Sequence, residues 1–382
     1  MIGLNRPARL HHLASDSSDT VLKRVFPDWA DRARIPLFAT SKELFVDANL
    51  KGFFGRRFAD LHGPELATML DSIGKGLVNP WSRLMPLWAS QSGRSMQKAA
   101  KTIKEIIDAE VTQRLRNLDE GREAGDYLTG LIASNEAEGY VNYHEQFLTY
   151  FFAAQINTFP TFAWTLLHLL RNPEHLASFE AEVGSNPPDV DGIYPIKDMP
   201  FSQACLRETG RLYNNLITLR YAQNDIRTPS GFIIPKGFVA SSPLTVAMDP
   251  ELYEDPGKWN PRRFLPQAAG EGEDGENKNV PRKSYATRLR DYEFVQFGAG
   301  KHACIGEKMT HSLLRGSLWP TLVDHYSLQL VGSENGLVEG VGMDGVGVAP
   351  NHGESLGTPV GMNEVYIKVT KREVPLSLAH HE

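Results

Sequence analysis

One cysteine in this chain lies where it could serve as a metal ligand. Cys304 is one of only two cysteines among 382 residues, it lies among the glycines of residues 298–306, and an apolar run over residues 309–323 follows it. That run predicts a helix, and at a helix N-terminus the backbone N–H groups and the helix dipole stabilise a thiolate. A soft, anionic sulfur is one of the axial ligands that proteins give to haem iron, and glycines let the backbone approach such a flat group closely. The alternative is an ordinary cysteine in a glycine-rich turn before a helix.

The same segment resembles the haem-binding loop of the cytochrome P-450 superfamily. The family's pattern is Phe, two residues, Gly, three residues, Cys, one residue and Gly, with a basic residue two positions before the cysteine. The positions that match are Phe297, Gly300, His302, Cys304 and Gly306. The resemblance implies that Cys304 ligates the iron of haem b (iron protoporphyrin IX). It also implies that Phe297, Gly298, Gly300, His302 and Gly306 hold the cofactor, with His302 on a propionate.

A second candidate group of residues consists of a carboxylate and a guanidinium that lie three positions apart in the sequence. Residues 201–213 predict a helix, on which Glu208 and Arg211 share one face and lie close enough to pair. Alone, this spacing is typical of a solvated ion pair. It resembles, however, the family's Glu-x-x-Arg helix, and residues 259–264 resemble the downstream segment that supplies a second arginine, here Arg263. The resemblance implies a buried cluster of these three residues with a structural role, holding the layer that supports the cysteine loop.

Arg220 is a further candidate for the cofactor site. It lies in the first β-like segment after that helix, at residues 217–221, and taken alone it could be a surface strand residue. In the family an arginine at this place binds a haem propionate, where a cation faces a carboxylate at the rim of an apolar slot. The resemblance therefore adds Arg220 to the cofactor-binding residues.

A long uncharged segment is the candidate for the helix that faces the cysteine loop across the haem site. Residues 142–171 predict one helix, and residues 147–170 carry no formal charge, which is long enough to cross a bilayer. Gln155, Asn157 and Pro160 lie near its middle, where polar groups are costly in lipid, so a helix buried inside a large protein is the favoured interpretation. Pro160 also removes a backbone N–H, which predicts a kink.

The resemblance implies that this helix crosses the distal face of the haem. The family's sequence there ends in an acid followed by two hydroxyl residues; here Ile156 replaces the acid, Asn157 replaces the first hydroxyl residue, and Thr158 matches the second. Asn157 and Thr158 are therefore the implied catalytic residues, which would order distal water. The Ala-x-Gln-x-Asn sequence looks like the branch that contains prostacyclin synthase and the cholesterol 7α-hydroxylases, some of whose members rearrange a peroxide. The alternative for Asn157 is a polar residue that satisfies a kinked helix.

The elements before and after this segment read as further helices. Ser41 would cap one helix, Pro64 would lie in the first turn of a second, and apolar residues at helical spacing predict an amphipathic helix over residues 96–111. Asn172 would cap another helix that begins at Pro173.

Short β-like segments lie at residues 217–221, 231–234, 238–241 and 365–369. The fold class is therefore mainly α with a small β region, and the resemblance implies a cytochrome P-450 fold. It implies one haem-thiolate domain over residues 1–382, N-terminally truncated because the family's early portion has no counterpart ahead of Met1. Residues 266–282 are rich in Gly, Glu and Asn and predict an exposed insertion. Residues 340–345 spell a dinucleotide-binding fingerprint, which we reject because its preceding strand and following helix are missing.

Composition narrows the classes of function. A formal charge of −6 provides no basic surface for nucleic acid, and two cysteines exclude a disulfide-rich secreted scaffold. Hydrophobic residues at 41% and charged residues at 23% are typical of a soluble globular enzyme. Residues 1–14 lack the apolar segment of a signal peptide or an N-terminal anchor. The expected location is intracellular, and the resemblance implies the surface of the endoplasmic reticulum membrane.

These features together predict a cytochrome P-450 monooxygenase. It would oxidise a hydrophobic small molecule, such as a sterol, terpenoid, fatty acid or polyketide of secondary metabolism, with dioxygen. Electrons would come from a separate NADPH-dependent reductase, because no flavin or nicotinamide motif is present. Two alternatives stay open. One is a haem-thiolate isomerase or dehydratase of peroxides, which needs no electron donor; the other is a haem-free remnant with a binding or scaffolding role.

Overall fold

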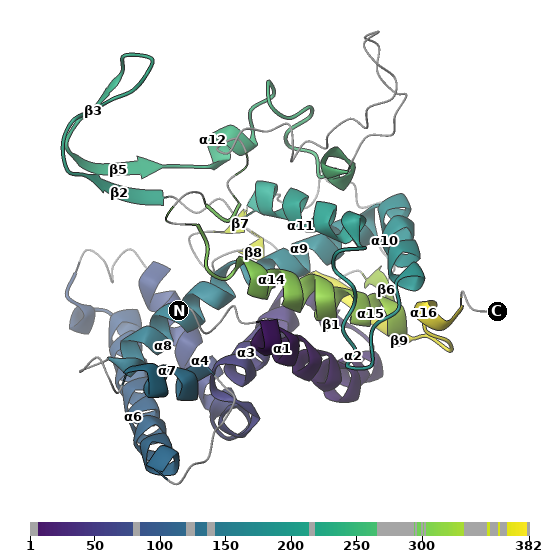
Figure 1. Ribbon diagram of the computed structural model, residues 1–382, viewed down its shortest axis with the longest axis horizontal. Helices are drawn as coiled ribbons and strands as arrows, with labels where there is room; N and C mark the ends of the chain where they lie inside the picture. The colour runs from purple at the N-terminus through teal and green to yellow at the C-terminus, as the bar shows by residue number, and fades with distance from the viewer. Residues whose placement is uncertain are drawn as a thin grey trace. The chain divides into compact units, whose positions relative to one another are not determined.

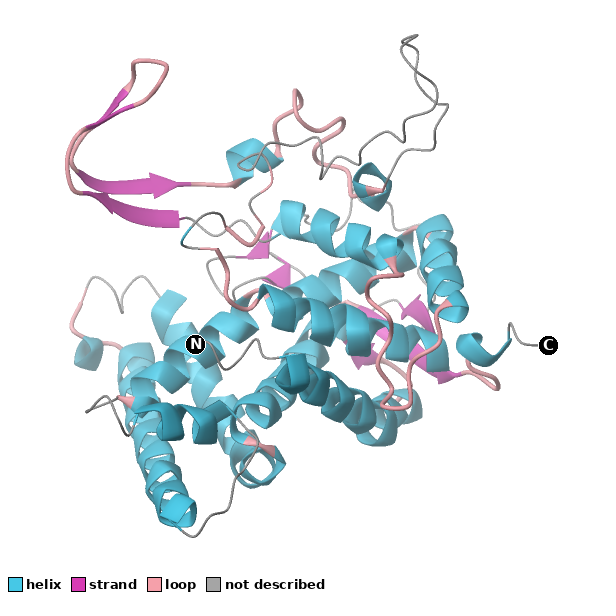
Figure 2. Cartoon of the chain, viewed as in Figure 1, coloured by secondary structure: helices cyan, strands magenta, loops and turns pink. Residues whose placement is uncertain are grey.

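The computed structural model describes residues 7–78, 85–119, 127–135, 142–213, 218–265, 294, 296–298, 301, 303–331, 350–351, 358–359 and 365–379. Helices predominate and strands are short (Figure 2), so the predicted fold class, mainly α with a small β region, is confirmed. The chain forms two compact units: a first unit of residues 1–199 and 305–382, and a second unit of residues 200–304. That residues 1–382 act as one domain stays a prediction, and the predicted insertion at 266–282 and the sequence at 340–345 lie outside the described residues.

The first unit begins with a set of packed helices (Figure 1). They are α1 (Pro7–Thr20), η1 (Val21–Val25), α2 (Phe26–Asp31), α3 (Leu37–Phe54), α4 (Arg56–Val78), η2 (Leu87–Ala89), α6 (Gln91–Asp119) and α7 (Tyr127–Asn135). Helix α4 packs against both α3 and α6. Their shared core contains Leu50, Phe53, Phe54, Phe58, Ile103, Ile107, Phe147 and Phe151. The amphipathic helix predicted over residues 96–111 is confirmed within α6, and it buries Ile103 and Ile107 completely.

Two predicted helix starts in this unit are wrong. Ser41 lies inside α3, where its hydroxyl donates to the Leu37 carbonyl oxygen at 2.6 Å instead of capping. The helix begins earlier because it buries Leu37 completely, and this burial outweighs the capping preference of a serine. Pro64 likewise lies inside α4, because that helix already begins at Arg56 and buries Phe58 ahead of the proline.

The uncharged segment forms two helices, α8 (Tyr143–Ile156) and α9 (Thr158–Arg171), instead of the one predicted. They meet at Asn157, and the break has a local cause: Pro160 has no N–H to donate to the Ile156 carbonyl. The Asn157 carbonyl accepts from the N–H and the hydroxyl of Thr161 at 3.1 and 2.6 Å. Helix α9 is almost wholly buried, which confirms the interpretation as a buried segment for this half, whereas α8 buries only Phe147, Phe151 and Gln155. Among the residues that the structure describes, none of the helices combines the length and the apolar character that a bilayer crossing requires.

Asn172 joins α9 to α10 (Pro173–Ser185), which begins at the predicted proline. The predicted side-chain cap is wrong, because the Asn172 amide turns back and donates to the His168 carbonyl oxygen at 2.7 Å. The start of α10 is instead satisfied by the Asn172 backbone carbonyl, which accepts from the N–H groups of His175 and Leu176. One asparagine therefore ends one helix with its side chain and begins the next with its backbone.

The rest of the first unit contains a helical run and a small sheet. The run consists of α14 (Glu307–Leu313), a π-helix η5 (Leu314–Leu318) and α15 (Trp319–His325), and the short α16 (Leu376–Ala379) ends the described chain. The antiparallel sheet has the order β1 (Ile35–Pro36), β9 (Tyr366–Lys371) and β6 (Tyr326–Val331), and a separate pair joins β7 (Pro350–Asn351) to β8 (Thr358–Pro359). In η5 the Gly316 carbonyl accepts from the N–H of Tyr194 at 2.9 Å. The strand predicted at residues 365–369 is confirmed as β9.

A buried carboxyl joins three distant segments of this unit. Asp324, in α15, is completely buried. Its oxygens accept from the Tyr194 hydroxyl and from both the N–H and the hydroxyl of Ser377, each at 2.7 Å. Burial, followed by the charge and hydrogen bond of Asp324, raises the pKa of Tyr194 well above its usual range, so this hydroxyl stays a donor.

The second unit carries the remaining elements. They are α11 (Pro200–Tyr213), β2 (Thr218–Ala222), β3 (Ile226–Arg227), β4 (Ile233–Ile234), β5 (Gly237–Ser241), α12 (Leu244–Ala247) and η3 (Pro261–Phe264). Strands β2 and β5 form the long antiparallel ribbon seen in Figure 1, with Arg220 opposite Val239. The three β-like segments predicted between residues 217 and 241 are confirmed as strands of this ribbon and of the β3–β4 pair.

One buried histidine gives the first unit a pH dependence. His168, in α9, is 1% exposed and stacks on Trp164 with ring centroids 6.1 Å apart. Burial, assisted by the nearby charge of Arg171, lowers the pKa of His168 to about 3. The unfolded chain therefore binds a proton that the folded chain rejects, and stability falls as the pH drops below about 6.5, the ordinary histidine value.

We expect the His168→Leu variant to lose part of this acid sensitivity. Between pH 6.5 and 4.5 the wild-type protein should lose about 2 kcal/mol more unfolding free energy than the variant, because leucine has no proton to gain. Urea titrations at a series of pH values measure the difference. His12→Leu, at an exposed position, is the control for loss of a histidine. Equal pH slopes in wild type and His168→Leu would contradict the prediction.

Candidate functional site

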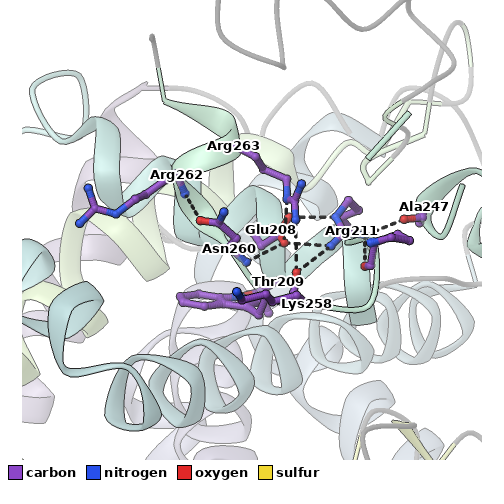
Figure 3. Close-up of polar contacts among 10 residues, drawn as sticks. Glu208, Thr209, Arg211, Ala247, Lys258, Asn260, Arg262 and Arg263 are labelled. Atoms are coloured by element: carbon purple, nitrogen blue, oxygen red, sulfur yellow. Dashed lines mark hydrogen bonds and ion pairs between the residues drawn. The ribbon is translucent and has the colours of Figure 1, made fainter. Parts of the chain in front are cut away.

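The centre of the candidate site is a carboxylate shared by two arginines (Figure 3). Glu208 of α11 is 0% exposed. Arg211 binds it with two hydrogen bonds, from Nε to Oε2 at 2.9 Å and from Nη2 to Oε1 at 2.8 Å. Arg263 of η3 donates from Nε to Oε1 at 3.1 Å. The structure thus brings Glu208, Arg211 and Arg263 into one buried cluster, in which charge-assisted hydrogen bonds offset the loss of water around the charges.

The remaining hydrogen bonds of the cluster go to the backbone. Arg211 Nη1 donates to the carbonyl oxygens of Ala247 and Pro256, at 2.6 and 2.7 Å. The backbone N–H of Asn260 donates to Glu208 Oε1 at 2.9 Å, and Arg263 Nη2 reaches the Lys258 carbonyl at 3.3 Å. The cluster therefore holds the irregular segment between α12 and η3 against α11.

The local sequence explains how Arg263 reaches the cluster. The Asn260 side chain accepts from the Arg262 N–H at 3.1 Å and caps η3, whose first residue is Pro261. In the tight 3₁₀ turn that follows, Arg262 is exposed and Arg263 is buried. Trp259 adds a contact just before the turn, from its indole N–H to the Thr209 hydroxyl at 3.0 Å.

The cysteine loop is closed by its own backbone. The N–H of Cys304 donates to the Phe297 carbonyl oxygen at 2.6 Å. Gly298 has a φ of +71°, a left-handed conformation that glycine adopts without strain. The side chain of Cys304 is exposed, and Gly306 is the residue that precedes α14. Gly300 and His302, the other predicted loop residues, lie outside the described residues.

Two residues that the sequence did not reveal connect the cysteine loop to the helix of the cluster. Gln296, next to Phe297, donates from Nε2 to the Leu206 carbonyl of α11 at 3.1 Å. A Cβ atom at Gly210 would lie 1.9 Å from Gln296 Nε2, so only glycine leaves room for this side chain. The sole signal in the sequence was a glycine inside an otherwise helical segment, which indicates a close approach without naming the partner.

The other predicted site residues are placed as follows. Arg220 lies in β2 with an exposed side chain, in the same unit as Cys304 and the cluster. Asn157 and Thr158 lie at the junction of α8 and α9 in the first unit, where Thr158 is 8% exposed. The roles assigned to these three residues stay predictions.

Comparisons with known proteins agree on one family. The family model described as cytochrome P-450 matches residues 21–336. The chain is 28% identical over 335 residues to the cytochrome P-450 monooxygenase pyvB of Aspergillus violaceofuscus, covering 85% of this chain and 63% of that protein. It is 26% identical over 324 residues to the sterol 14-alpha demethylase cyp51A of Aspergillus fumigatus, covering 80% of this chain and 62% of that protein.

The chain therefore spans about 63% of the length of the first of these curated relatives. Among solved structures, a retinoic acid-bound cyanobacterial CYP120A1 is similar with a TM-score of 0.70 and 19% sequence identity, over 96% of this chain and 76% of that one. At this level of identity the likeness shows the fold alone.

Proposed function

The chain belongs to the cytochrome P-450 family, and we propose that it is a haem-thiolate monooxygenase with Cys304 as the iron ligand. The observation that carries the proposal is the geometry of the cysteine loop. A backbone hydrogen bond from Cys304 to Phe297 closes the loop, and a hydrogen bond from Gln296 joins it to α11, the helix that carries Glu208. An exposed sulfur on such a loop is a donor that fits haem iron. When bound through a thiolate, haem supplies an electron-rich iron that favours O–O cleavage and oxidation of C–H or C=C bonds.

The residues of this chain would bind and orient the cofactor. Arg220 and His302 would bind the haem propionates, as cations that face carboxylates. Gly298, with its left-handed backbone and no Cβ atom, would let the turn of the cysteine loop approach the haem ring closely. The Glu208 cluster would fix the helix under the loop and so keep the Cys304 sulfur at one position. Asn157 and Thr158 would hold a water on the distal side through an amide and a hydroxyl, neither of which titrates near neutral pH.

The family and its named relatives support a proposed substrate class. We propose a hydrophobic small molecule of the sterol, terpenoid, fatty acid or polyketide type, with haem b as the cofactor and a separate NADPH-dependent reductase as the electron source. Two of the named relatives are a fungal monooxygenase and a sterol demethylase. Location at the endoplasmic reticulum membrane surface is part of the proposal, and fractionation of cells expressing the tagged chain tests it.

We expect the carbon-monoxide difference spectrum of the purified, reduced protein to show a thiolate-ligated Soret band, and the Cys304→Ser variant to lose it. Serine cannot supply the soft sulfur that gives this spectrum. Cys205→Ala is the matched control, because Cys205 is the other cysteine and is completely buried. An unchanged spectrum in Cys304→Ser would overturn the proposal, and a wild-type protein without any haem spectrum would favour the haem-free remnant.

One observation favours a second candidate, the peroxide isomerase. Ile156 occupies the place of the family's distal acid, so this position provides no carboxyl group that could deliver protons to a distal oxygen. Turnover of a lipid hydroperoxide without NADPH or reductase would favour the isomerase. Turnover that requires both would favour the monooxygenase.

A further inference from the structure

A groove in the first unit is lined by none of the residues that the proposed function uses. Residues of η1, α2, α3 and α4 form it, and its volume is about 890 Å³. Ligand pockets in proteins are typically about 300–1,000 Å³, so the groove has room for an organic molecule. Val25, Trp29 and Ala67 are among the apolar residues that line it.

Acidic side chains outnumber basic ones in this groove. Some of the acids already have partners: Asp28 pairs with Arg32 at 2.7 Å, and Asp47 pairs with Arg24 at 3.0 Å and with Lys51 at 2.7 Å. The one basic lining residue, Arg24, is therefore already paired with an acid of the groove. The lining residues with a formal charge are Asp28, Glu43, Asp47, Asp60 and Arg24.

Glu43 of α3 and Asp60 of α4 are the acids of the groove that remain for a ligand. In the part of the chain that the structure describes, neither carboxylate has an ion-pair partner. Both side chains are exposed, so a ligand in the groove can reach their oxygens. The two helices that carry them pack against each other, which brings both carboxylates to one groove.

The hydroxyl groups of the groove also present acceptors. Thr40 donates to the Pro36 carbonyl oxygen at 2.6 Å, and Thr68 donates to the Pro64 carbonyl oxygen at 3.2 Å. Because each hydroxyl has only one proton, these oxygens are left as acceptors. Carboxylate and hydroxyl oxygens together complement a ligand that has positive charge and several hydrogen-bond donors.

We propose that this groove binds an aliphatic diamine or polyamine. A protonated amine has three N–H donors and one positive charge, which match a carboxylate. One ammonium group pairs with Glu43 and a second with Asp60, while the methylene chain between them lies against the apolar lining residues, as the stem of a lysine does on a protein surface. None of these contacts involves Cys304 or the haem, so the site stands or falls independently of the proposed monooxygenase.

A pair of ligands of equal length, 1,6-diaminohexane and 1,6-hexanediol, tests the proposal, because they differ in the charge of their ends. Isothermal titration calorimetry on the full chain should show the diamine binding about 2- to 25-fold more tightly, the combined factor of two exposed ion pairs. Added NaCl should weaken the diamine and leave the diol unchanged. Equal binding of the two ligands, or no binding of the diamine, would overturn the site.

Three substitutions locate the binding site. Glu43→Gln and Asp60→Asn should each weaken the diamine by about 1.5- to 5-fold, the share of one exposed ion pair, and leave the diol unchanged. Glu65→Gln is the matched control, because Glu65 is an exposed acid of α4 that does not line the groove. Thermal unfolding verifies that each variant is folded.

Two results of these titrations would contradict the proposal. An equal loss of affinity in Glu65→Gln would show that the diamine responds to the overall negative charge and not to this groove. Displacement of the diamine by MgCl₂, beyond the effect of NaCl at the same ionic strength, would show that the carboxylates prefer a metal ion.

Discussion

Replacing Glu208 with alanine is expected to lower the free energy of unfolding by about 3–5 kcal/mol, the range for removal of one partner from a buried ion pair. The reason is that Arg211 and Arg263 are 3% and 8% exposed and would both keep a charge without a carboxylate. The Asn260 N–H would lose its acceptor as well. Because the same contacts hold the segment between α12 and η3 on α11, the loss should also weaken the support of the cysteine loop.

Guanidinium denaturation of the wild type and of Glu208→Ala measures the change in unfolding free energy. Retention of haem during gel filtration measures how well the cysteine loop is still supported. Glu105→Ala is the matched control, because Glu105 pairs with Lys101 at 3.9 Å on the surface, with side chains 63% and 79% exposed. Exposed pairs contribute little, so the control should change stability by well under about 1 kcal/mol. Equal effects of the two substitutions would show that the Glu208 cluster does not stabilise the fold.

A second large effect is expected from Asp324→Ala, with a loss of about 3 kcal/mol or more. Three donors, one from Tyr194 and two from Ser377, would be left buried without an acceptor, and each such group costs about 1–3 kcal/mol. The substitution would release both the loop at residue 194 and helix α16 from α15. Urea denaturation followed by tryptophan fluorescence measures the change.

Tyr194→Phe separates the hydrogen bond that Tyr194 donates to Asp324 from the two that Ser377 donates. It removes one donor and leaves Asp324 with its two hydrogen bonds from Ser377, so we expect a loss of about 1 kcal/mol. The double variant should be at least as stable as Asp324→Ala alone, since Tyr194→Phe then removes a hydroxyl that has already lost its acceptor. Additive losses would contradict a shared hydrogen bond.

The candidate site was predictable where its signal was local in the sequence. The spacing of Glu208 and Arg211 on one helix face, and the glycines around Cys304, are short-range patterns, so they indicated their elements before any packing was known. Gln296 and Gly210 were not predictable, because their contact joins residues far apart in sequence through one side chain that fits over one glycine.

The predictions of helix boundaries were wrong for a related reason, because tertiary packing decided where the helices begin. Ser41 has the chemistry of a cap, but burial of Leu37 four residues earlier contributes more than a capping hydrogen bond. At Asn172 the side chain had two possible partners, the end of one helix and the start of the next, and only the packed structure determined which it took. The break at Asn157 was foreseen as a kink from Pro160, because the missing N–H is a property of the residue itself.

The π-helix η5 has a consequence for insertions and deletions. A π-turn accommodates one extra residue within a single wider turn, so shortening Leu314–Leu318 by one residue would restore regular α-helical winding and leave α14 and α15 facing nearly as they do now. Met309, now 7% exposed, would stay on the core face and Lys308 on the solvent face. A one-residue deletion within Leu314–Leu318 should therefore disturb the core less than a deletion inside α14 or α15, where it would rotate one part of the helix by about 100°.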